Sequence, residues 1–234
     1  AAQRREVVKR EFIYPAFGRF WHWTQAFLII FLAVTGFEIH GAFSFFGYAS
    51  AVRFHSAAAT GFLVLIAFAI FWHFTTDEWK QYVPTWTNLR AQAEYYLFGI
   101  FRDAPHPTRK TRQLKLNPLQ KLTYAGLKLL VIPVVVTSGL LYMFFRYPQK
   151  HDVLSLGVNA LEPIALAHTA GAFALVAFLV AHLYLTTTGH TLTSNLKAMV
   201  TGWEDFPDDD AHAAPEAPGA RVPGDAPEAA TTAR

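Results

Sequence analysis

Half of the histidines in this chain lie within or at the ends of long apolar stretches. These five are His22, His55, His73, His168 and His182. An imidazole can bind a metal through one ring nitrogen, and two imidazoles on opposite sides of a haem iron complete its six-coordinate state. One such histidine is weak evidence, because it can instead donate a hydrogen bond to a neighbouring helix. The case for haem binding therefore depends on whether the spacings agree.

The spacing of two of these histidines places them on one face of one helix. His168 and His182 are 14 residues apart, which in an α-helix puts them within about 40° of each other and roughly 21 Å apart along the axis. Where successive helices run in opposite directions, His55 at the start of the second stretch lies level with His168. His22 at the start of the first stretch lies level with His182. The sequence thus predicts an outer pair (His55 and His168) and an inner pair (His22 and His182), each suited to one haem between facing helices.

His73 is a rival ligand for the inner pair. It lies 18 residues after His55, five full turns along the same face, and could bind with His182 in place of His22. We favour His22, because it lies inside its apolar stretch, whereas His73 ends its own stretch and is followed by polar residues. A haem ring is largely apolar and prefers the drier position. His73 would then lie near the edge of the inner haem or near a quinone.

The chain contains no cysteine. This excludes disulfides, a thiol nucleophile, cysteine-bound iron–sulfur clusters and zinc sites, and the covalent attachment of a c-type haem. Any haems are therefore held non-covalently, as b-type haems. Arg19 and Arg53 flank the inner and outer levels and could pair with haem propionates, although membrane topology alone would also explain them. Glycines inside the stretches, such as Gly36 and Gly139, would admit a flat macrocycle or simply let helices pack closely.

Four apolar stretches must position these histidines. The chain has 234 residues, of which 53% are hydrophobic and only 16% charged, whereas a soluble domain has about a quarter charged residues. The stretches cover residues 20–39, 55–74, 122–145 and 164–187. Each has the roughly 20 residues that cross a bilayer core of about 30 Å. We therefore expect an all-α fold, a transmembrane four-helix bundle in one domain of residues 1–206, rather than a soluble protein with four buried helices.

Basic residues cluster before the first stretch and between the second and third stretches. The positive-inside rule then places both termini in the cytoplasm and the first and third loops outside. The net charge of +3 is too small to suggest a nucleic-acid partner. We expect a multi-pass protein of the bacterial cytoplasmic (inner) membrane, with membrane lipid and no nucleic acid among its partners.

The second loop and the C-terminal segment have contrasting patterns. Thr85 follows a proline and can cap a helix from Trp86 to about Phe101, whose apolar residues recur at helical spacing. We interpret this segment as an amphipathic helix on the inner membrane surface, with a partner-binding helix as the alternative. Residues 207–234 are rich in proline and alanine and carry three aspartates near their start, so we expect a disordered cytoplasmic tail.

Several motifs occur around the positions of these histidines. They are Arg19-Phe20-Trp21-His22-Trp23, Thr35-Gly36-Phe37, His55, Asn117-Pro118-Leu119-Gln120-Lys121 and the pair His168 and His182. Over about residues 14–200 the chain resembles the di-haem cytochrome b membrane subunits of formate dehydrogenase (its gamma subunit), nickel–iron hydrogenase and thiosulfate reductase. The resemblance implies that the inner pair binds one b haem iron and the outer pair another, which is the pairing reached above from depth alone.

The resemblance also implies a quinone pocket beside the inner haem, formed by Asn117, Gln120 and Lys121 with His182. Formate dehydrogenase has a small residue where this chain has Leu119, which changes the shape of that pocket. Asn117 has a second interpretation, because an asparagine before a proline is a good helix N-cap. Capping alone and capping plus quinone contact remain alternatives, and Gln120 and Lys121 could be merely interfacial residues.

Together these features predict an electron-transfer subunit of a quinone-linked oxidoreductase complex, with two b haems as cofactors and menaquinone or ubiquinone as substrate. Such a subunit would anchor a periplasmic catalytic or electron-transfer subunit, either an iron–sulfur or a multihaem cytochrome c protein, in a respiratory chain. One alternative is a stand-alone cytochrome b561-like quinone oxidoreductase, which needs no docked partner. Another is a haemless membrane anchor or transporter, which a haem assay would distinguish.

Overall fold

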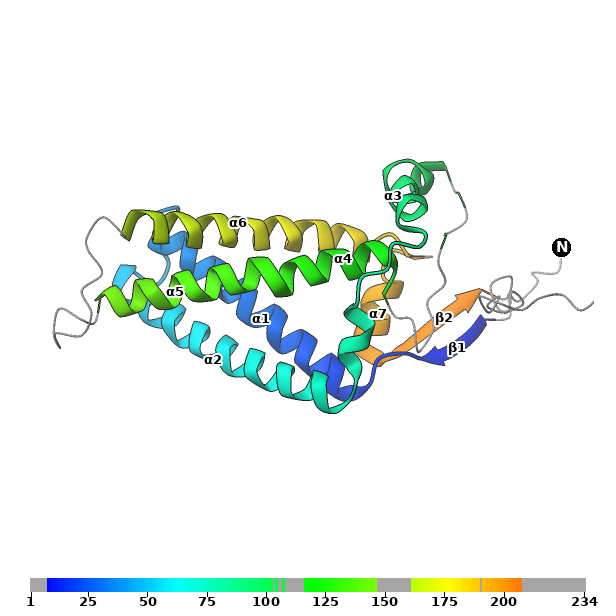
Figure 1. Cartoon of the computed structure of the whole chain (residues 1–234), viewed down its shortest axis with the longest axis horizontal. Coiled ribbons are helices and arrows are strands. Elements are labelled where there is room, and N and C mark those ends of the chain that lie inside the picture. Colours follow the sequence, from blue (N-terminus) through cyan, green and yellow to red (C-terminus); the bar gives the residue numbers. More distant parts are fainter. Residues whose placement is uncertain are drawn as a thin grey trace, which may run out of the picture. The chain divides into compact units, whose positions relative to one another are not determined.

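The computed structural model describes residues 8–102, 104, 107, 116–146, 161–189 and 191–207. Four helical segments in this part of the chain are long and apolar enough to cross a membrane: α1 (Ala16–Ile39), α2 (Tyr48–Thr75), the continuous segment Pro118–Met143 and α6 (Leu161–Thr186). The expected helical fold with four candidate spans is confirmed (Figure 1). Both α1 and α2 begin before their apolar stretches, so His22 and His55 lie about two turns inside their helices rather than at the start.

The third span contains an irregular turn. It consists of α4 (Pro118–Gly126), the π-helical turn η3 (Leu127–Val131) and α5 (Ile132–Arg146). A π-helical turn closes on the fifth residue rather than the fourth, and such turns are frequent at functional sites. Nothing in the apolar pattern of residues 122–145 indicates this interruption.

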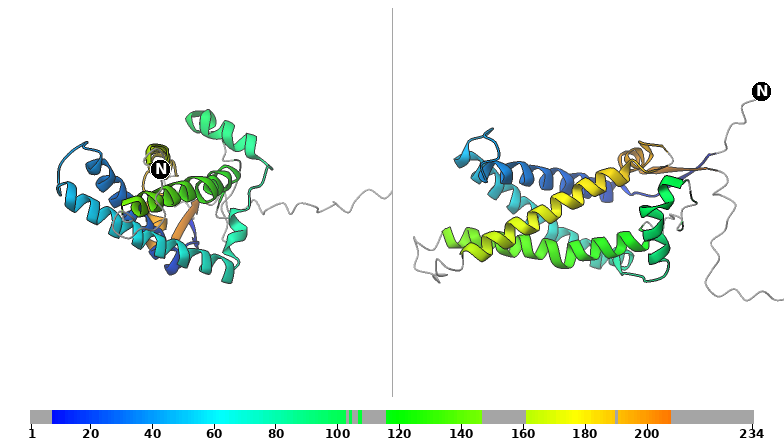
Figure 2. Two further views of the ribbon diagram at one scale, coloured as in Figure 1. Left: turned by 60° about the vertical axis from the view of Figure 1, so that its left-hand side comes forward. Right: turned by 90° about the horizontal axis from the view of Figure 1, so that it is seen from above.

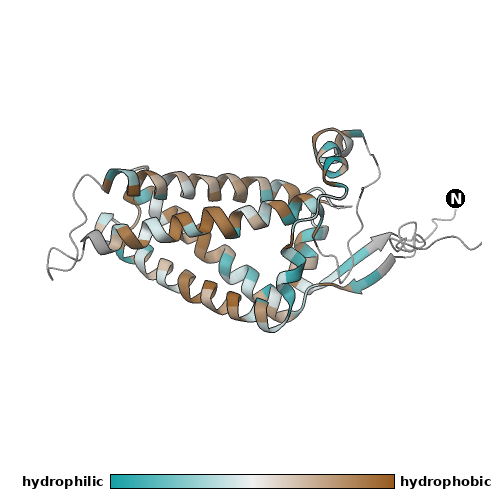
Figure 3. Ribbon diagram, viewed as in Figure 1, coloured by the Kyte–Doolittle hydropathy of each residue, from teal (hydrophilic) through white to brown (hydrophobic). Residues whose placement is uncertain are grey.

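The spans pack as two helix pairs. Helix α1 lies along α2, and α5 lies along α6 (Figures 1 and 2). Small residues such as Ala51, Ala58 and Gly171 are buried within the pairs, where they let helix backbones approach closely. Large apolar side chains point outward instead; Leu129 is 79% and Leu166 69% exposed, and apolar residues recur along all four spans (Figure 3). An exposed apolar surface of this extent suits contact with lipid.

One carboxylate orders the connection between α1 and α2. Glu38, near the end of α1, is buried, and its Oε1 atom accepts hydrogen bonds from the backbone N–H groups of Phe45, Phe46 and Gly47 at 2.8, 2.7 and 2.7 Å. Gly47 has a φ of 81°, a left-handed conformation that glycine adopts most readily. The carboxylate therefore fixes the turn from which α2 begins at Tyr48.

The segment between α2 and α4 contains the described short helices η1 (Glu78–Tyr82), α3 (Leu89–Leu97) and η2 (Gly99–Arg102). The expected helix from Trp86 to about Phe101 is therefore wrong in its bounds. Asn88 adopts a left-handed conformation with a φ of 60°, so the helix begins only after it. Helix α3 is held against α4, because the side-chain amide of Asn117 donates to the Tyr96 hydroxyl at 3.0 Å. Its position on a membrane surface stays a prediction.

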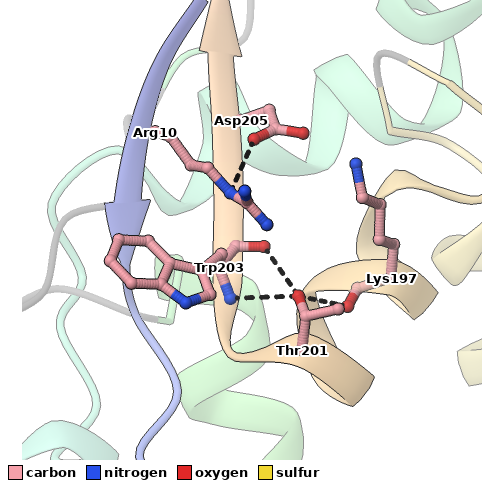
Figure 4. Close-up of polar contacts among 5 residues, drawn as sticks. All are labelled: Arg10, Lys197, Thr201, Trp203 and Asp205. Atoms are coloured by element: carbon pink, nitrogen blue, oxygen red, sulfur yellow. Dashed lines mark hydrogen bonds and ion pairs between the residues drawn. The ribbon is translucent and has the colours of Figure 1, made fainter.

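The helix α7 (Ser194–Thr201) precedes strand β2 (Trp203–Pro207), which pairs with β1 (Val8–Phe12) in a two-stranded sheet that the sequence pattern did not predict. The chain divides into a unit Phe12–Glu204 and a smaller unit that includes residues 8–11 and 205–207. In the smaller unit Arg10 and Asp205 form an ion pair of 3.5 Å (Figure 4). In the larger unit the Thr201 hydroxyl accepts from the backbone N–H of Trp203 at 3.2 Å (Figure 4). Beyond Pro207, the tail expected to be disordered lies outside the described residues.

Candidate functional site

His168 of α6 is held by two acceptors on α5. Its Nδ1 atom lies 3.0 Å from the carbonyl oxygen of Val135 and 3.3 Å from Oγ of Ser138. A carbonyl oxygen can only accept a hydrogen bond, so Nδ1 must carry the proton and donate it. The other ring nitrogen, Nε2, therefore keeps its lone pair available for a metal.

His55 of α2 is held in the same way by α1. Its Nδ1 atom lies 3.0 Å from Oγ1 of Thr35, whose hydroxyl donates to the carbonyl oxygen of Phe31 at 2.8 Å. Because the Thr35 hydroxyl proton is already engaged, the ring donates through Nδ1. Nε2 is again the nitrogen with a free lone pair.

The rings of His55 and His168 face each other across the two helix pairs. Their centres are 6.3 Å apart and their planes lie at 71°. Glycines leave room for both rings: a Cβ atom on Gly36 would lie 3.5 Å from Cε1 of His55, and one on Gly139 only 2.9 Å from Cε1 of His168. Each ring is thus seated directly against the backbone of the preceding helix.

His22 and His182 form the second facing pair. Their ring centres are 6.1 Å apart and their planes lie at 53°. The right-hand view of Figure 2 shows α6 leaving α5 toward α1, where this pair forms. Phe178 stacks on His182 at 5.7 Å, and Trp23 lies edge-on to His22 at 5.2 Å. The Nδ1 atom of His22 is buried with no hydrogen-bond partner among the described residues.

His73 occupies a different environment. Its ring lies 5.9 Å from that of Trp21 and 5.2 Å from that of Tyr82, and its Nδ1 lies 2.6 Å from the carbonyl oxygen of Ala69 in its own helix. The geometry therefore places His22, rather than His73, opposite His182. Whether His22 binds a metal stays a prediction.

Both histidine pairs have the spacing that one iron between two imidazoles requires. With metal–nitrogen bonds of about 2.0 Å and about 1.1 Å from each nitrogen to its ring centre, two rings on one iron are about 6.2 Å apart between centres. The observed separations are 6.1 and 6.3 Å. Within the described ranges no group of three or more histidine, aspartate or glutamate side chains could hold a metal ion. Two ligands suit a haem iron, because the porphyrin supplies the other four.

Two donors without partners lie within one helical turn of His22 in α1. Among the described residues, Nε of Arg19 and Nε1 of Trp21 are buried without a hydrogen-bond partner, although another guanidinium nitrogen of Arg19 donates to the carbonyl of Val200. Such donors fit the carboxylate oxygens of a haem propionate. Arg53, expected to play the same role at the other pair, is exposed, and its guanidinium donates to Oγ of Ser50 at 3.3 Å.

The residues expected at a quinone pocket form the N-terminal cap of α4. Oδ1 of Asn117 accepts from the backbone N–H of Gln120 at 2.8 Å, and Oε1 of Gln120 accepts from the backbone N–H of Asn117 at 3.0 Å. With its amide donating to Tyr96, Asn117 has both ends of its side chain engaged. The capping interpretation of Asn117 is therefore confirmed, and quinone contact stays a prediction. Lys121, one residue further on, is buried.

A lysine inside the third span contacts the loop before it. Lys128 lies in the π-helical turn η3, with Nζ 3.1 Å from the ring centre of Tyr82 and 5.9 Å from that of Trp21. A cation over an aromatic face is attracted by the ring quadrupole. Burial, with a smaller contribution from Tyr124, raises the pKa of Tyr82 to about 12. Tyr82 therefore stays neutral at physiological pH, and its hydroxyl remains a potential proton donor.

Sequence reasoning missed Thr35 and Ser138 as hydrogen-bond partners of the candidate ligands. Their contacts with His55 and His168 join different helices, so no local periodicity reveals them. One signal was present: each hydroxyl residue directly precedes a glycine, as Thr35-Gly36 and Ser138-Gly139. The repeat of this dipeptide ahead of an intramembrane histidine could have indicated the arrangement.

Comparison with known proteins identifies relatives over most of the chain. The family model described as "Prokaryotic cytochrome b561" matches residues 13–202. YdhU of Escherichia coli K12, which is named as a cytochrome, is 34% identical over 200 residues, covering 82% of this chain and 74% of that protein. The Escherichia coli K12 protein named "Probable Ni/Fe-hydrogenase 1 B-type cytochrome subunit" is 22% identical, covering 86% of this chain and 93% of its own. A hydrogenase B-type cytochrome subunit of Rhizobium leguminosarum, also named as probable, is 25% identical, covering 88% and 95%. No solved structure matches the chain significantly.

Proposed function

Because this chain belongs to the prokaryotic cytochrome b561 family, we propose that it is the membrane-anchoring cytochrome b subunit of a respiratory oxidoreductase complex. Family membership makes it a multi-pass membrane protein that binds b-type haem and takes part in electron transfer. The finer proposal is that it holds two b haems and passes electrons between a redox partner at the outer surface of the bacterial inner membrane and the quinone pool. An orientation with both termini in the cytoplasm, from the positive-inside rule, is part of the same proposal.

The two facing histidine pairs are the observation that carries this proposal. His168 and His182 lie toward opposite ends of α6, so the spans offer one two-histidine site near each membrane surface. When bound at such a site, a b haem supplies reversible one-electron chemistry at its iron. The chain supplies the ligands, fixes their spacing at 6.1 and 6.3 Å between ring centres, and surrounds them with apolar helices. Arg19 and Arg53 are the proposed propionate partners.

A partner subunit follows from the relatives. Two of them are named as cytochrome subunits of nickel–iron hydrogenases, which supports a complex between this chain and a catalytic subunit. We propose that the partner is periplasmic and carries iron–sulfur clusters or several c-type haems, because the candidate site His55–His168 faces that side in the proposed orientation. Docked there, such a partner would exchange electrons over the shortest path.

The quinone would react near His22 and His182, close to the start of α4. Since the Asn117 side chain already caps this helix, Lys121 and the side-chain amide nitrogen of Gln120 are the donors we propose for a quinone oxygen. Asn117→Ser should keep the cap, because serine is an equally good N-cap. This variant also loses the bond to Tyr96, so if the amide contacts quinone it should slow haem reduction by quinol more than Tyr96→Phe, which breaks the same bond and leaves Asn117 in place. An unchanged rate would assign Asn117 to capping alone.

Lys121→Met tests the quinone role separately. We expect slower haem reduction by a menaquinol or ubiquinol analogue, with an unchanged haem spectrum. Thr123→Val is a matched control on the same helix, because its exposed hydroxyl donates to the Leu119 carbonyl of its own helix at 2.9 Å. Equal rates for Lys121→Met, Thr123→Val and the unmodified chain would contradict a quinone site at this lysine.

Purification in a mild detergent from native membranes tests the proposed function as a whole. The expected result is a b-type spectrum together with a co-purifying redox subunit whose substrate reduces the haems. A haem-bearing chain that purifies alone and reduces quinone with a small diffusible donor would instead be a stand-alone oxidoreductase. A folded chain without haem would overturn the proposal.

A further inference from the structure

The two helix pairs repeat one hydrogen-bonding arrangement. In each, a hydroxyl residue on the first helix bonds the ring of a histidine on the second: Thr35 with His55 at 3.0 Å, and Ser138 with His168 at 3.3 Å. Each hydroxyl also donates to the carbonyl four residues earlier in its own helix. The His168 ring in addition meets the carbonyl three residues before Ser138, that of Val135.

This arrangement fixes the tautomer of both rings. A hydroxyl whose proton is already donated to a backbone carbonyl can only accept a hydrogen bond from the ring. A carbonyl oxygen can never donate one. Nδ1 of His55 and of His168 is therefore the protonated nitrogen. Thr35 is fully buried and Ser138 nearly so, so water does not compete for these bonds.

At least one histidine of the His22–His182 pair lacks such a hydrogen bond at Nδ1. Nδ1 of His22 is buried with no partner among the described residues. The ring contacts of this pair are instead aromatic, from Trp23 and Phe178. The two candidate sites therefore match in ring spacing but differ in whether Nδ1 of each imidazole has a hydrogen-bond partner.

A hydrogen bond from Nδ1–H makes the opposite nitrogen a stronger electron donor to a metal. A stronger donor stabilises ferric iron more than ferrous iron, because the ferric ion carries the higher charge. We infer that Thr35 and Ser138 are positioning residues that give the His55–His168 site the lower midpoint potential of the two. This inference rests on the proposed binding of two b haems. The lower midpoint potential at the His55–His168 site would make transfer of one electron from that site to the His22–His182 site favourable. The first site would be oxidised and the second reduced.

The test is a redox titration of the purified haem-loaded chain followed by absorbance. We expect two one-electron waves, of which His55→Ala removes the lower. Thr35→Val has nearly the same shape as threonine but cannot accept from the ring, so the lower wave should move to higher potential while the upper wave stays in place. Each tenfold loss in relative affinity for ferric iron would appear as a shift of about 59 mV. Thr35→Ser should restore the original value, and Ser138→Ala should shift the same wave by less, because the Val135 carbonyl remains.

Thr60→Val is the matched control. Its hydroxyl likewise donates to the carbonyl four residues earlier, that of Ser56 at 2.9 Å, and the residue is exposed on α2. We expect no shift of either wave in this variant. The inference is overturned if Thr35→Val leaves the lower wave in place, if it moves the upper wave instead, or if His55→Ala removes the upper wave. Failure of the proposed two-haem function would give a different result from failure of this inference. The unmodified chain would then hold fewer than two b haems before any titration.

Discussion

His22 of α1 and His182 of α6 face each other with ring centres 6.1 Å apart, although 160 residues separate them in the sequence. His73, the other histidine near this level, lies against Trp21 and Tyr82. We therefore predict that His22→Ala loses the low-spin spectrum of the inner haem, because one axial ligand is missing. His73→Ala should keep both haems and at most slow quinone turnover. Absorbance and electron paramagnetic resonance spectra of the purified variants measure both outcomes.

Added imidazole separates a lost ligand from a misfolded chain. If His22→Ala merely lacks a ligand, free imidazole added together with haem should fill the site and restore the low-spin signal. A low-spin inner haem that survives in His22→Ala but is absent from His73→Ala would reverse the assignment and pair His73 with His182.

The outer pair gives an independent prediction. His55→Ala and His168→Ala should each remove one haem and leave the other, since the two rings share one site at 6.3 Å between centres. The haem content of each purified variant, compared with the unmodified chain, is the measurement. Retention of two low-spin haems in either variant would show that this pairing is wrong, as would the loss of both haems from a folded chain.

Three glycines should respond to substitution in a graded way. A Cβ atom on Gly139 would lie 2.9 Å from Cε1 of His168, closer than real Cβ contacts, and that ring is already fixed by Val135 and Ser138. We expect Gly139→Ala to displace the ring and weaken or abolish the outer low-spin haem. Gly36→Ala, at 3.5 Å from His55, should be tolerated, and Gly126→Ala, with open space around it, should leave both haems intact. Equal haem spectra for all three variants would contradict this geometry.

Glu38 should be important for stability rather than for redox chemistry. Its carboxylate accepts three backbone N–H groups in the turn before α2, and an unpaired buried donor costs about 1–3 kcal/mol. Glu38→Ala should lower the free energy of unfolding by about 2 kcal/mol or more. Glu38→Gln, which keeps an acceptor oxygen, should lose less. Thermal unfolding in detergent, followed by tryptophan fluorescence, measures both; a Glu38→Ala variant as stable as the parent would refute the role.

The helical fold and the histidine pairing could be predicted because both depend on regular periodicity. Four charge-poor stretches indicate four spans, and a separation of 14 residues puts His168 and His182 on one face of α6. The facing of His22 with His182 follows once the helices alternate in direction. The alternative pairing through His73 remained open because depth along a helix does not determine which ring turns toward which neighbour.

Features that depend on local irregularity or on contacts between helices could not be predicted. The left-handed Asn88 shortens α3, and the π-helical turn at Lys128 interrupts the third span, yet neither changes the apolar pattern. The bonds of Thr35 to His55 and of Asn117 to Tyr96 join residues that only tertiary packing brings together. A sheet of two short strands that lie far apart in the sequence leaves no clear alternation to detect.

The central claim is that the chain binds two b haems, one at each histidine pair. A pyridine haemochrome assay with a protein determination on the same purified sample tests this most directly, because it counts b haems per chain whatever the partner or the direction of electron flow. The account predicts two b haems per chain in the unmodified protein and one in either His22→Ala or His55→Ala. A folded chain with no haem, or with the same haem content in all three proteins, would contradict it.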